Sequence, residues 1–241
     1  HEGAARGEPW DRARQALYTA MRGALTVLHG GPGTGKTTLT QRILASLFDQ
    51  YDAPDSERPL RVALAAPTGK AAARLRQSID QSLASLQLSL GESIDLKNLT
   101  DRMGKASTVH ALLGMQAGSR QFKHNAQRPL DVDVLVVDET SMVPLQLMAR
   151  LFEALGSRSR LLLVGDDAQL ESVESGSVLR DLVSSAGLLD GSVFDLQKVR
   201  RITGDNPIAT VAPMIRKGEA ETALAAIQNS GPQLIFVETT A

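Results

Sequence analysis

The chain has 241 residues, of which 42% are hydrophobic and 22% charged, a composition that suits one globular α/β domain with at most a small appendage. The formal net charge is −1, so nucleic-acid binding would require a local groove. The absence of cysteine excludes disulfides and thiolate metal sites and fits a cytoplasmic protein. No apolar run reaches membrane-spanning length, so we expect neither a membrane span nor a signal peptide. Because the chain does not begin with Met, we expect a fragment of a longer protein.

Residues 1–24 are predicted to form an N-terminal tail and a leading helix. Apolar residues recur there at helical spacing, at Trp10, Ala13, Leu17 and Met21. This pattern predicts a helix that packs along one stripe.

The stretch 25–38 contains the most specific pattern of the chain. Residues 25–29 predict a buried strand, the next residues are rich in glycine, and Lys36 and Thr37 open a helix. The order is G-x-x-x-x-G-K-T between a strand and a helix, which is typical of a phosphate-binding loop. An ordinary glycine-rich turn is the alternative.

A helix N-terminus presents free N–H groups and the positive end of the helix dipole, so an anion binds there. In this loop Lys36 is expected near the β and γ phosphates, and Thr37 is expected to give its hydroxyl to Mg²⁺. The predicted nucleotide-binding residues are Gly31, Pro32, Gly33, Thr34, Gly35, Lys36, Thr37 and Thr38.

A second predicted strand, 61–66, also ends in a short polar loop before a helix. Because the carboxyl ends of parallel strands line the ligand crevice, Thr68 and Lys70 are candidates to bind nucleic-acid phosphates. A capped helix with a solvated lysine is the alternative. Residues 87–106 predict an inserted helical segment. Further along the chain lies an isolated histidine, His110, and from the local sequence alone it can be a purely structural hydrogen-bonding residue.

Two further strands, 132–138 and 160–164, are almost entirely apolar, as buried parallel strands are. The first ends in Asp138 and Glu139. We predict that Asp138 holds a metal through water and that Glu139 is the general base on the attacking water, although a structural acid pair is the alternative. After the second strand, Gln169 is placed to sense a γ-phosphate.

The remainder of the chain predicts helices over 176–185, 206–217 and 219–228 and strands over 193–199 and 233–237. Lys198, Arg200 and Arg201 cluster there. Either one arginine reaches the γ-phosphate from the rim of the site, or the cluster is a solvated basic turn.

Six motifs succeed one another in the order GGPGTGKTT, APTGKAAARL, STVHALLG, VLVVDETSMV, GDDAQLESVESGSVL and LQKVRR. This set resembles the superfamily 1 DNA helicases of the RecD type, including the alpha subunit of bacterial exodeoxyribonuclease V. The resemblance covers residues 25–218. It implies a RecA-like P-loop NTPase domain, with a mostly parallel central sheet and helices on both faces. Residues 25–241 would be the first motor domain, and the second motor domain would be absent from this sequence.

The resemblance also implies roles for particular residues, with ATP and Mg²⁺ as cofactors. The implied catalytic residues are Lys36, Asp138, Glu139, Gln169 and Arg201, and the implied metal ligands are Thr37 and Asp138. Contacts to single-stranded DNA are implied at Thr68, Lys70, Thr108 and His110.

The implied function is an ATP-dependent 5′→3′ DNA helicase in double-strand break repair and recombination, with the beta and gamma subunits of exodeoxyribonuclease V as partners. The fragment alone would be weakly active. Two departures stand out: Gln15 is offset from the family's adenine-reading glutamine, and Ile202 replaces the usual Gln or Phe. The alternatives are a stand-alone RecD-like helicase and an ATP-gated DNA-binding module without unwinding activity.

Overall fold

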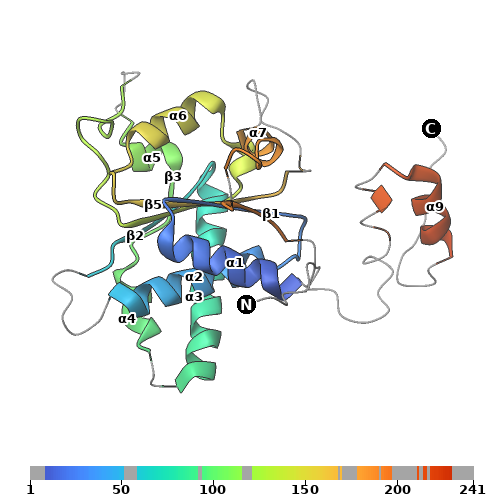
Figure 1. Cartoon of the computed structure of the whole chain (residues 1–241), viewed down its shortest axis with the longest axis horizontal. Coiled ribbons are helices and arrows are strands. Elements are labelled where there is room, and N and C mark those ends of the chain that lie inside the picture. Colours follow the sequence, from blue (N-terminus) through green and yellow to red (C-terminus); the bar gives the residue numbers. More distant parts are fainter. Residues whose placement is uncertain are drawn as a thin grey trace.

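The computed structural model describes residues 9–51, 59–91, 94–115, 121–167, 169, 178–189, 191–196, 211, 214–215 and 218–229 (Figure 1). The strands are β1 (Leu25–His29), β2 (Val62–Ala66), β3 (Ser107–Thr108), β4 (Val134–Val137), β5 (Arg160–Gly165) and β6 (Val193–Asp195). The helices are α1 (Pro9–Arg22), α2 (Lys36–Tyr51), α3 (Gly69–Leu90), α4 (Leu96–Arg102), α5 (Val109–Leu113), the 3-10 helix η2 (Thr140–Met142), α6 (Leu145–Glu153), α7 (Val178–Ser184) and α9 (Ala220–Gln228). The predicted strand 233–237 lies outside the described residues, and the predicted helix 206–217 lies mostly outside them.

The strands form one six-stranded sheet in the order β3-β2-β4-β5-β1-β6. Every described pairing between these six strands is parallel, and the register places Leu28 of β1 beside Val164 of β5 and Phe194 of β6. Because the strands all run the same way, their carboxyl ends lie along one edge of the sheet. The prediction of an α/β fold with a mostly parallel sheet is confirmed.

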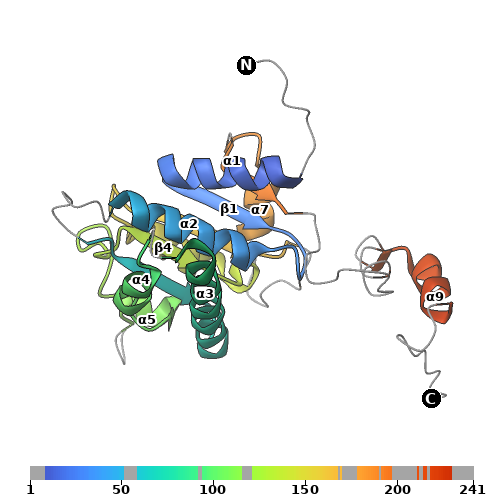
Figure 2. The ribbon, with the colours of Figure 1, turned by 90° about the horizontal axis from the view of Figure 1, so that it is seen from below.

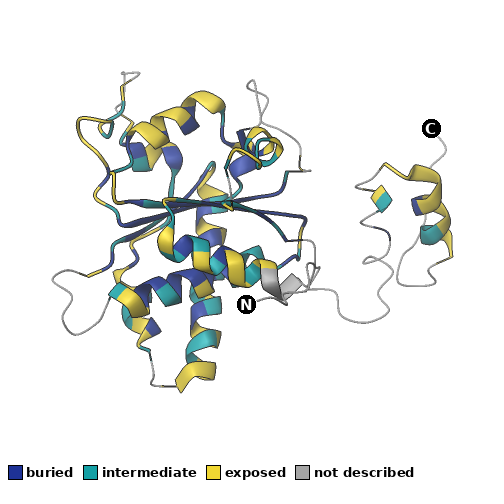
Figure 3. Cartoon of the chain, in the orientation of Figure 1, coloured by how far each residue is buried: buried dark blue, intermediate teal, exposed yellow. Residues whose placement is uncertain are grey.

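Helices cover both faces of the sheet, as predicted. Figure 1 shows α1, α2, α3 and α4 on one face and α5, α6 and α7 on the other. Alternate residues of β5 serve the two layers: Leu162 and Val164 join the core under α1–α4, whereas Leu161 and Leu163 join the other core. The strands are therefore apolar on both sides, and Figure 3 shows them buried between helices whose outer sides are exposed.

Helix α1 lies against α2, and Figure 2 shows α1, α2 and α3 across one face of the sheet. Its most buried residues are Ala16 and Ala20, while Ala13, Leu17 and Met21 are partly buried beside them. The described part of the predicted apolar stripe is thus the flank of the contact, and the side chain of Trp10 lies outside the described residues. The centre of the contact between α1 and α2 is formed by Ala16 and Ala20, because small side chains let two helices approach closely.

The sequence predicts a helix over 145–155 with Met148, Leu151, Phe152 and Leu155 facing inward. The structure ends α6 at Glu153, and the inward position is wrong for Phe152. Met148 and Leu151 are fully buried, but Phe152 is 41% exposed. The buried stripe runs through Leu147, Met148, Leu151 and Ala154, and position 152 falls at its margin. Large apolar side chains face inward only as a tendency, and a single one at the surface is ordinary.

Over residues 87–106 the structure has the end of α3, then α4. Leu96, Leu99 and Met103 are buried in the same core as α2 and α3. Arg76 of α3 donates hydrogen bonds to three carbonyl oxygens of this segment, those of Thr100 (2.8 Å), Met103 and Gly104 (2.5 Å). The segment is therefore packed into the helical layer, and the predicted helical segment is part of the fold.

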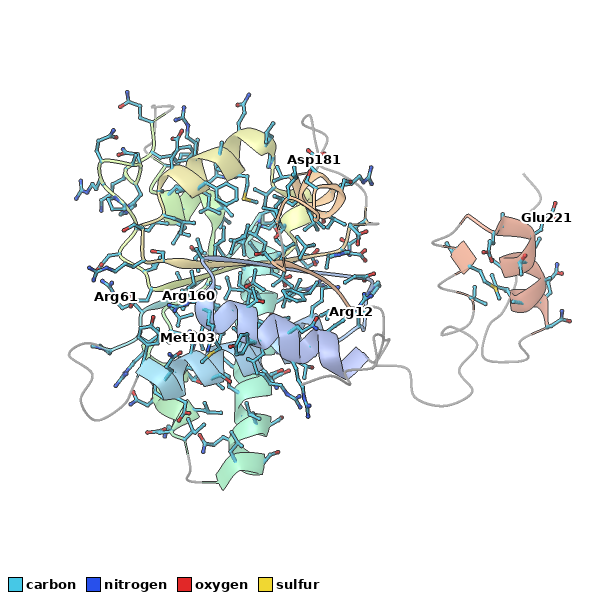
Figure 4. The ribbon with its side chains drawn as sticks, in the orientation of Figure 1. Arg12, Arg61, Met103, Arg160, Asp181 and Glu221 are labelled. Carbon is cyan, nitrogen blue, oxygen red and sulfur yellow. The ribbon has the colours of Figure 1, made fainter. Side chains whose placement is uncertain are left out.

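The amino ends of β2 and β4 are joined by Arg61 and Asp133 (Figure 4 labels Arg61). The buried Asp133 carboxylate accepts hydrogen bonds from the Arg61 backbone N (2.9 Å), Nε (3.1 Å) and Nη2 (3.1 Å). These charge-assisted bonds raise the pKa of the Arg61 guanidinium above its ordinary value. We expect Asp133→Asn to lower the free energy of unfolding by about 2 kcal/mol, measured by urea denaturation.

The matched control is Asp131→Asn, because Asp131 also pairs with Arg61 but its side chain is 84% exposed. An exposed pair contributes about 0–1 kcal/mol, so this variant is expected to unfold almost as the parent chain does. If Asp133→Asn and Asp131→Asn lowered the free energy of unfolding equally, the buried Asp133 carboxylate would not stabilise the fold more than the exposed one.

Candidate functional site

The glycine-rich loop between β1 and α2 has the backbone shape of an anion cradle. Gly30, Gly33 and Gly35 have φ angles of 143°, 78° and 95°, a region that side chains rarely tolerate. The Thr34 hydroxyl donates to the carbonyl of Gly31 at 2.9 Å and closes the turn. The loop ends where α2 begins at Lys36, so the free N–H groups of a helix N-terminus face the same place.

A cavity of about 440 Å³ opens in front of this loop. It lies where the carboxyl ends of β1, β4 and β5 meet. Its lining residues are Pro32, Gly33, Thr34, Gly35, Lys36, Thr37, Thr38, Arg74, Leu75, Ser78, Asp138, Glu139, Gly165, Asp166 and Gln169. Of the eight residues predicted to bind nucleotide, only Gly31 is not in this lining; its carbonyl oxygen instead accepts hydrogen bonds from Thr34 and Lys36.

Lys36 is directed at its own loop. Its Nζ donates to the carbonyl oxygens of Gly30 (2.6 Å) and Gly31 (2.9 Å), and it also acts electrostatically on Asp138. The ammonium group thus lies against the phosphate loop, and Lys36 lines the cavity. A phosphate group in the cradle would offer it a charged acceptor in place of two neutral ones.

The acidic pair at the end of β4 is held in an unusual backbone conformation. Glu139 has φ 51° and ψ 40°, and it is the one non-glycine residue with positive φ in the described part of the chain. Its N–H donates to Asp138 Oδ1 at 2.9 Å. Strained left-handed residues cluster at functional sites, where the surrounding structure holds them in place.

Thr140 joins the ends of two strands. Its buried hydroxyl lies 3.0 Å from the carbonyl oxygen of Val137 on β4 and 2.9 Å from that of Val164 on β5. The acidic pair and the turn that carries Gln169 are therefore fixed relative to each other.

Burial raises the pKa of the Asp138 carboxyl, and the negative charge of Glu139 raises it further; the Glu139 N–H and Lys36 act in the opposite direction. Folding therefore favours protonated Asp138. This contribution to stability is present below the ordinary pKa of aspartate and is lost as the pH rises through the raised value. We expect Asp138→Asn to raise the thermal unfolding midpoint of the nucleotide-free chain at pH 7, and the gain to vanish at acidic pH.

The control for this substitution is Asp181→Asn on α7, because Asp181 is exposed. Calorimetry at several pH values is the measurement. A lower midpoint for Asp138→Asn at pH 7 would contradict the assigned cost of ionising Asp138.

The turn after β5 contributes a second link to the phosphate loop. His29 Nδ1 at the end of β1 donates to Asp167 Oδ1 at 3.0 Å, since an ionised carboxylate only accepts. The N–H of Gln169, an exposed residue, donates to the carbonyl of the buried Asp166 at 3.2 Å. The sequence does not reveal the pair of His29 and Asp167, because no local pattern joins residues so far apart.

Two of the four predicted DNA contacts cap helices. Thr68 accepts from the N–H of Ala71 at the start of α3, and Thr108 accepts from the N–H of Ala111 at the start of α5. β2 and β3 are paired so that residue 66 lies opposite Thr108, which places both caps at the carboxyl edge of the sheet. Lys70 and His110, the other two, are exposed in the first turns of these helices.

Helix capping is what the structure shows for the two threonines, and DNA binding remains a prediction. Arg200 and Arg201 lie outside the described residues, so the structure does not place the predicted motor arginine. Gln15 is exposed on α1 and does not line the cavity.

A magnesium ion fits the residues at this cavity. Mg²⁺ is usually held by one or two carboxylates together with phosphate oxygens and waters, and Thr37 and Asp138 would complete such a shell. Over the described ranges no three His, Asp or Glu side chains group as metal ligands, so an all-protein metal cage is not found there. No helix within those ranges has the length and apolar character of a membrane span.

Comparison with known families agrees with this geometry. A family model described as an AAA domain matches residues 13–175. The chain belongs to the AAA domain family. The matched range contains the glycine-rich loop, the acidic pair and Gln169, and it ends before Arg201. The P-loop part of the predicted fold class is thereby confirmed.

The chain is similar to curated RecD proteins. It is 44% identical over 232 residues to the RecBCD enzyme subunit RecD of Mycolicibacterium smegmatis, covering 96% of this chain and 40% of that protein. It is 38% identical over 255 residues to the RecBCD enzyme subunit RecD of Haemophilus influenzae, covering 95% of this chain and 39% of that protein. The ATP-dependent RecD2 DNA helicase of Deinococcus radiodurans is 39% identical over 196 residues, covering 81% of this chain and 22% of that protein.

These relatives confirm the resemblance to RecD-type helicases. The chain spans about two fifths of the length of the two RecD subunits. Among solved structures, Bacteroides Pif1 bound to ssDNA superimposes with a TM-score of 0.52 at 17% identity, covering 92% of this chain and 49% of that one. Pif1 helicase from Candida albicans superimposes with a TM-score of 0.51 at 23% identity, covering 86% of this chain and 43% of that one. These two likenesses show the fold.

Proposed function

We propose that this chain is the first motor domain of an ATP-dependent 5′→3′ DNA helicase that acts in double-strand break repair and recombination. It is a RecD-like helicase domain with a P-loop. The observation that carries the proposal is that Lys36, the Asp138–Glu139 pair and Gln169, from three different strand ends, line one cavity. A cavity that only bound nucleotide would not need an acid beside the metal-binding one.

In the proposed mechanism Glu139 accepts a proton from a water that attacks the γ-phosphate in line. Lys36 stabilises the charge on the β and γ phosphates, and Gln169 donates a hydrogen bond to the γ-phosphate. Thr37 and, through water, Asp138 would hold Mg²⁺, which would supply positive charge beside the phosphates. Arg201 is the proposed arginine that stabilises the transition state from the rim.

Single-stranded DNA is proposed to bind along the carboxyl edge of the sheet, at Thr68, Lys70, Thr108 and His110. All four residues lie in or next to the first turns of α3 and α5, where backbone N–H groups and a cation favour phosphate. Contacts of this kind read the backbone, so we expect little sequence preference and a strong decrease of affinity with salt.

The proposed partners are the beta and gamma subunits of exodeoxyribonuclease V, in the cytoplasm, because relatives at about 40% identity are RecBCD subunits. A stand-alone helicase is the second candidate, and the similarity to a RecD2 helicase favours it. Co-purification of two large chains with the full-length protein would support the first candidate.

ATP hydrolysis with and without a single-stranded oligonucleotide tests the function. The 241-residue chain is expected to bind nucleotide and hydrolyse it slowly, because these residues are proposed to form the first motor domain alone. The full-length protein is expected to hydrolyse ATP faster when DNA is added, with stimulation that falls as salt rises. An ATPase that DNA does not stimulate would contradict the motor and favour an ATP-gated binding module.

A further inference from the structure

Helix α3 contributes two polar residues to the cavity wall, Arg74 and Ser78, that the sequence does not single out. They are four residues apart and therefore share one face of the helix. Leu75, between them, is buried in the core and also borders the cavity. The helix is thus fixed by its apolar side while Arg74 faces the space in front of the phosphate loop.

Arg74 has a different environment from its near neighbour Arg76. Arg76 donates to three carbonyl oxygens and pairs with Asp80 at 2.9 Å, so its charge is used within the fold. Arg74 is exposed and makes no hydrogen bond or ion pair with the residues that the structure describes. Its guanidinium is therefore available to a ligand in the cavity.

Acidic residues outnumber cationic residues among the described residues that line the cavity. Asp138, Glu139 and Asp166 bring three carboxylates to its wall, whereas Lys36 and Arg74 are the cations among the described lining residues. A bound polyphosphate adds more negative charge. Arginine presents a planar fork of N–H donors that matches phosphate oxygens, so one at this wall offsets part of the repulsion.

The strand order indicates which end of a nucleotide Arg74 faces. α3 comes after β2, which pairs with β4, and the phosphate loop comes after β1, two strands beyond β4 in the sheet. Arg74 therefore approaches from the side of Glu139, which is the side of the γ-phosphate. We propose that Arg74 binds the γ-phosphate of ATP and so makes the site prefer ATP to ADP. The inference rests on the proposed ATP site.

The test is competition of ATP and of ADP against a fluorescent nucleotide on the 241-residue chain, with Mg²⁺ present. Arg74→Ala is expected to weaken ATP binding about tenfold, which corresponds to about 1.4 kcal/mol, because a hydrogen bond to a charged phosphate oxygen is lost. ADP binding is expected to change little. Arg74→Lys keeps the positive charge but loses the planar fork of N–H donors, so its ATP affinity is expected to lie between those of the parent chain and of Arg74→Ala.

Two controls accompany these variants. Gln77→Ala removes an exposed side chain of the same helix, and Arg42→Ala removes an exposed arginine of α2; neither residue lines the cavity. Both are expected to bind ATP and ADP like the parent chain. An unchanged preference for ATP over ADP in Arg74→Ala, or an equal loss for both nucleotides, would overturn the proposal. If the parent chain bound neither nucleotide, the proposed function itself would fail.

Discussion

Glu139→Gln is expected to lower the rate of ATP hydrolysis by about 10²–10⁴-fold, the usual contribution of a general base. Glutamine has nearly the same shape but cannot accept the proton of the attacking water. The backbone of residue 139 is held in place by its bond to Asp138 and by the neighbouring Thr140, so the left-handed conformation is expected to survive the substitution. ATP affinity is therefore expected to change by no more than about twofold.

Single-turnover hydrolysis on the full-length protein, beside nucleotide binding, measures the two quantities separately. The matched control is Glu153→Gln on α6, which removes an exposed carboxylate that pairs with Arg150 at 2.8 Å. Hydrolysis by this control is expected to be normal. A Glu139→Gln protein with undiminished hydrolysis would assign the base to another group and remove the main support for the mechanism.

Gly30→Ala is expected to destabilise the chain by about 2–4 kcal/mol, the range of severe point substitutions. A Cβ at Gly30 would lie 2.6 Å from the carbonyl oxygen of Leu196, and its φ of 143° is already unfavourable for alanine. Leu196 cannot easily retreat, because its N–H donates to the carbonyl of His29 at 2.8 Å. The midpoint of thermal unfolding is expected to fall by roughly 5–10 °C.

Gly69→Ala is the matched control. Gly69 is the first residue of α3, and a Cβ there meets nothing within 4 Å. Alanine is favoured over glycine in a helix, so this variant is expected to be unchanged or more stable by up to about 1 kcal/mol. If both alanines had the same effect, the close approach of Leu196 to the phosphate loop would not be a constraint on the fold.

The elements at the site are predictable from the sequence because their signals are local. The predicted strand 25–29 has the bounds of β1, and the predicted helix at Lys36 begins where α2 begins. A strand buried on both faces reads as a continuous apolar run, and a glycine-rich turn before Lys-Thr is typical of a phosphate loop that opens a helix. In a parallel sheet the ends of β1, β4 and β5 then lie at one edge, where they share one cavity.

Other features depend on which strands are neighbours, which no local pattern encodes. Arg74 reaches the cavity only because β2 pairs with β4, and His29 meets Asp167 only because β1 pairs with β5. At Phe152 a local pattern misleads instead: helical spacing predicts an inward side chain, and the structure exposes it. Helical spacing gives the direction of a side chain to within a turn, and the width of the buried stripe is set by the elements that pack above it.

The position of β1 has a consequence for how the protein is made. Both of its neighbours come late in the chain: β5 at 160–165 and β6 at 193–195. During synthesis the first strand leaves the ribosome well over a hundred residues before either neighbour can pair with it. Until then its apolar edge is unprotected, and the phosphate loop has no partner strand to shape it. Nascent chains that end before residue 160 are therefore expected to need a chaperone, and to gain affinity for nucleotide only after residue 196 has emerged.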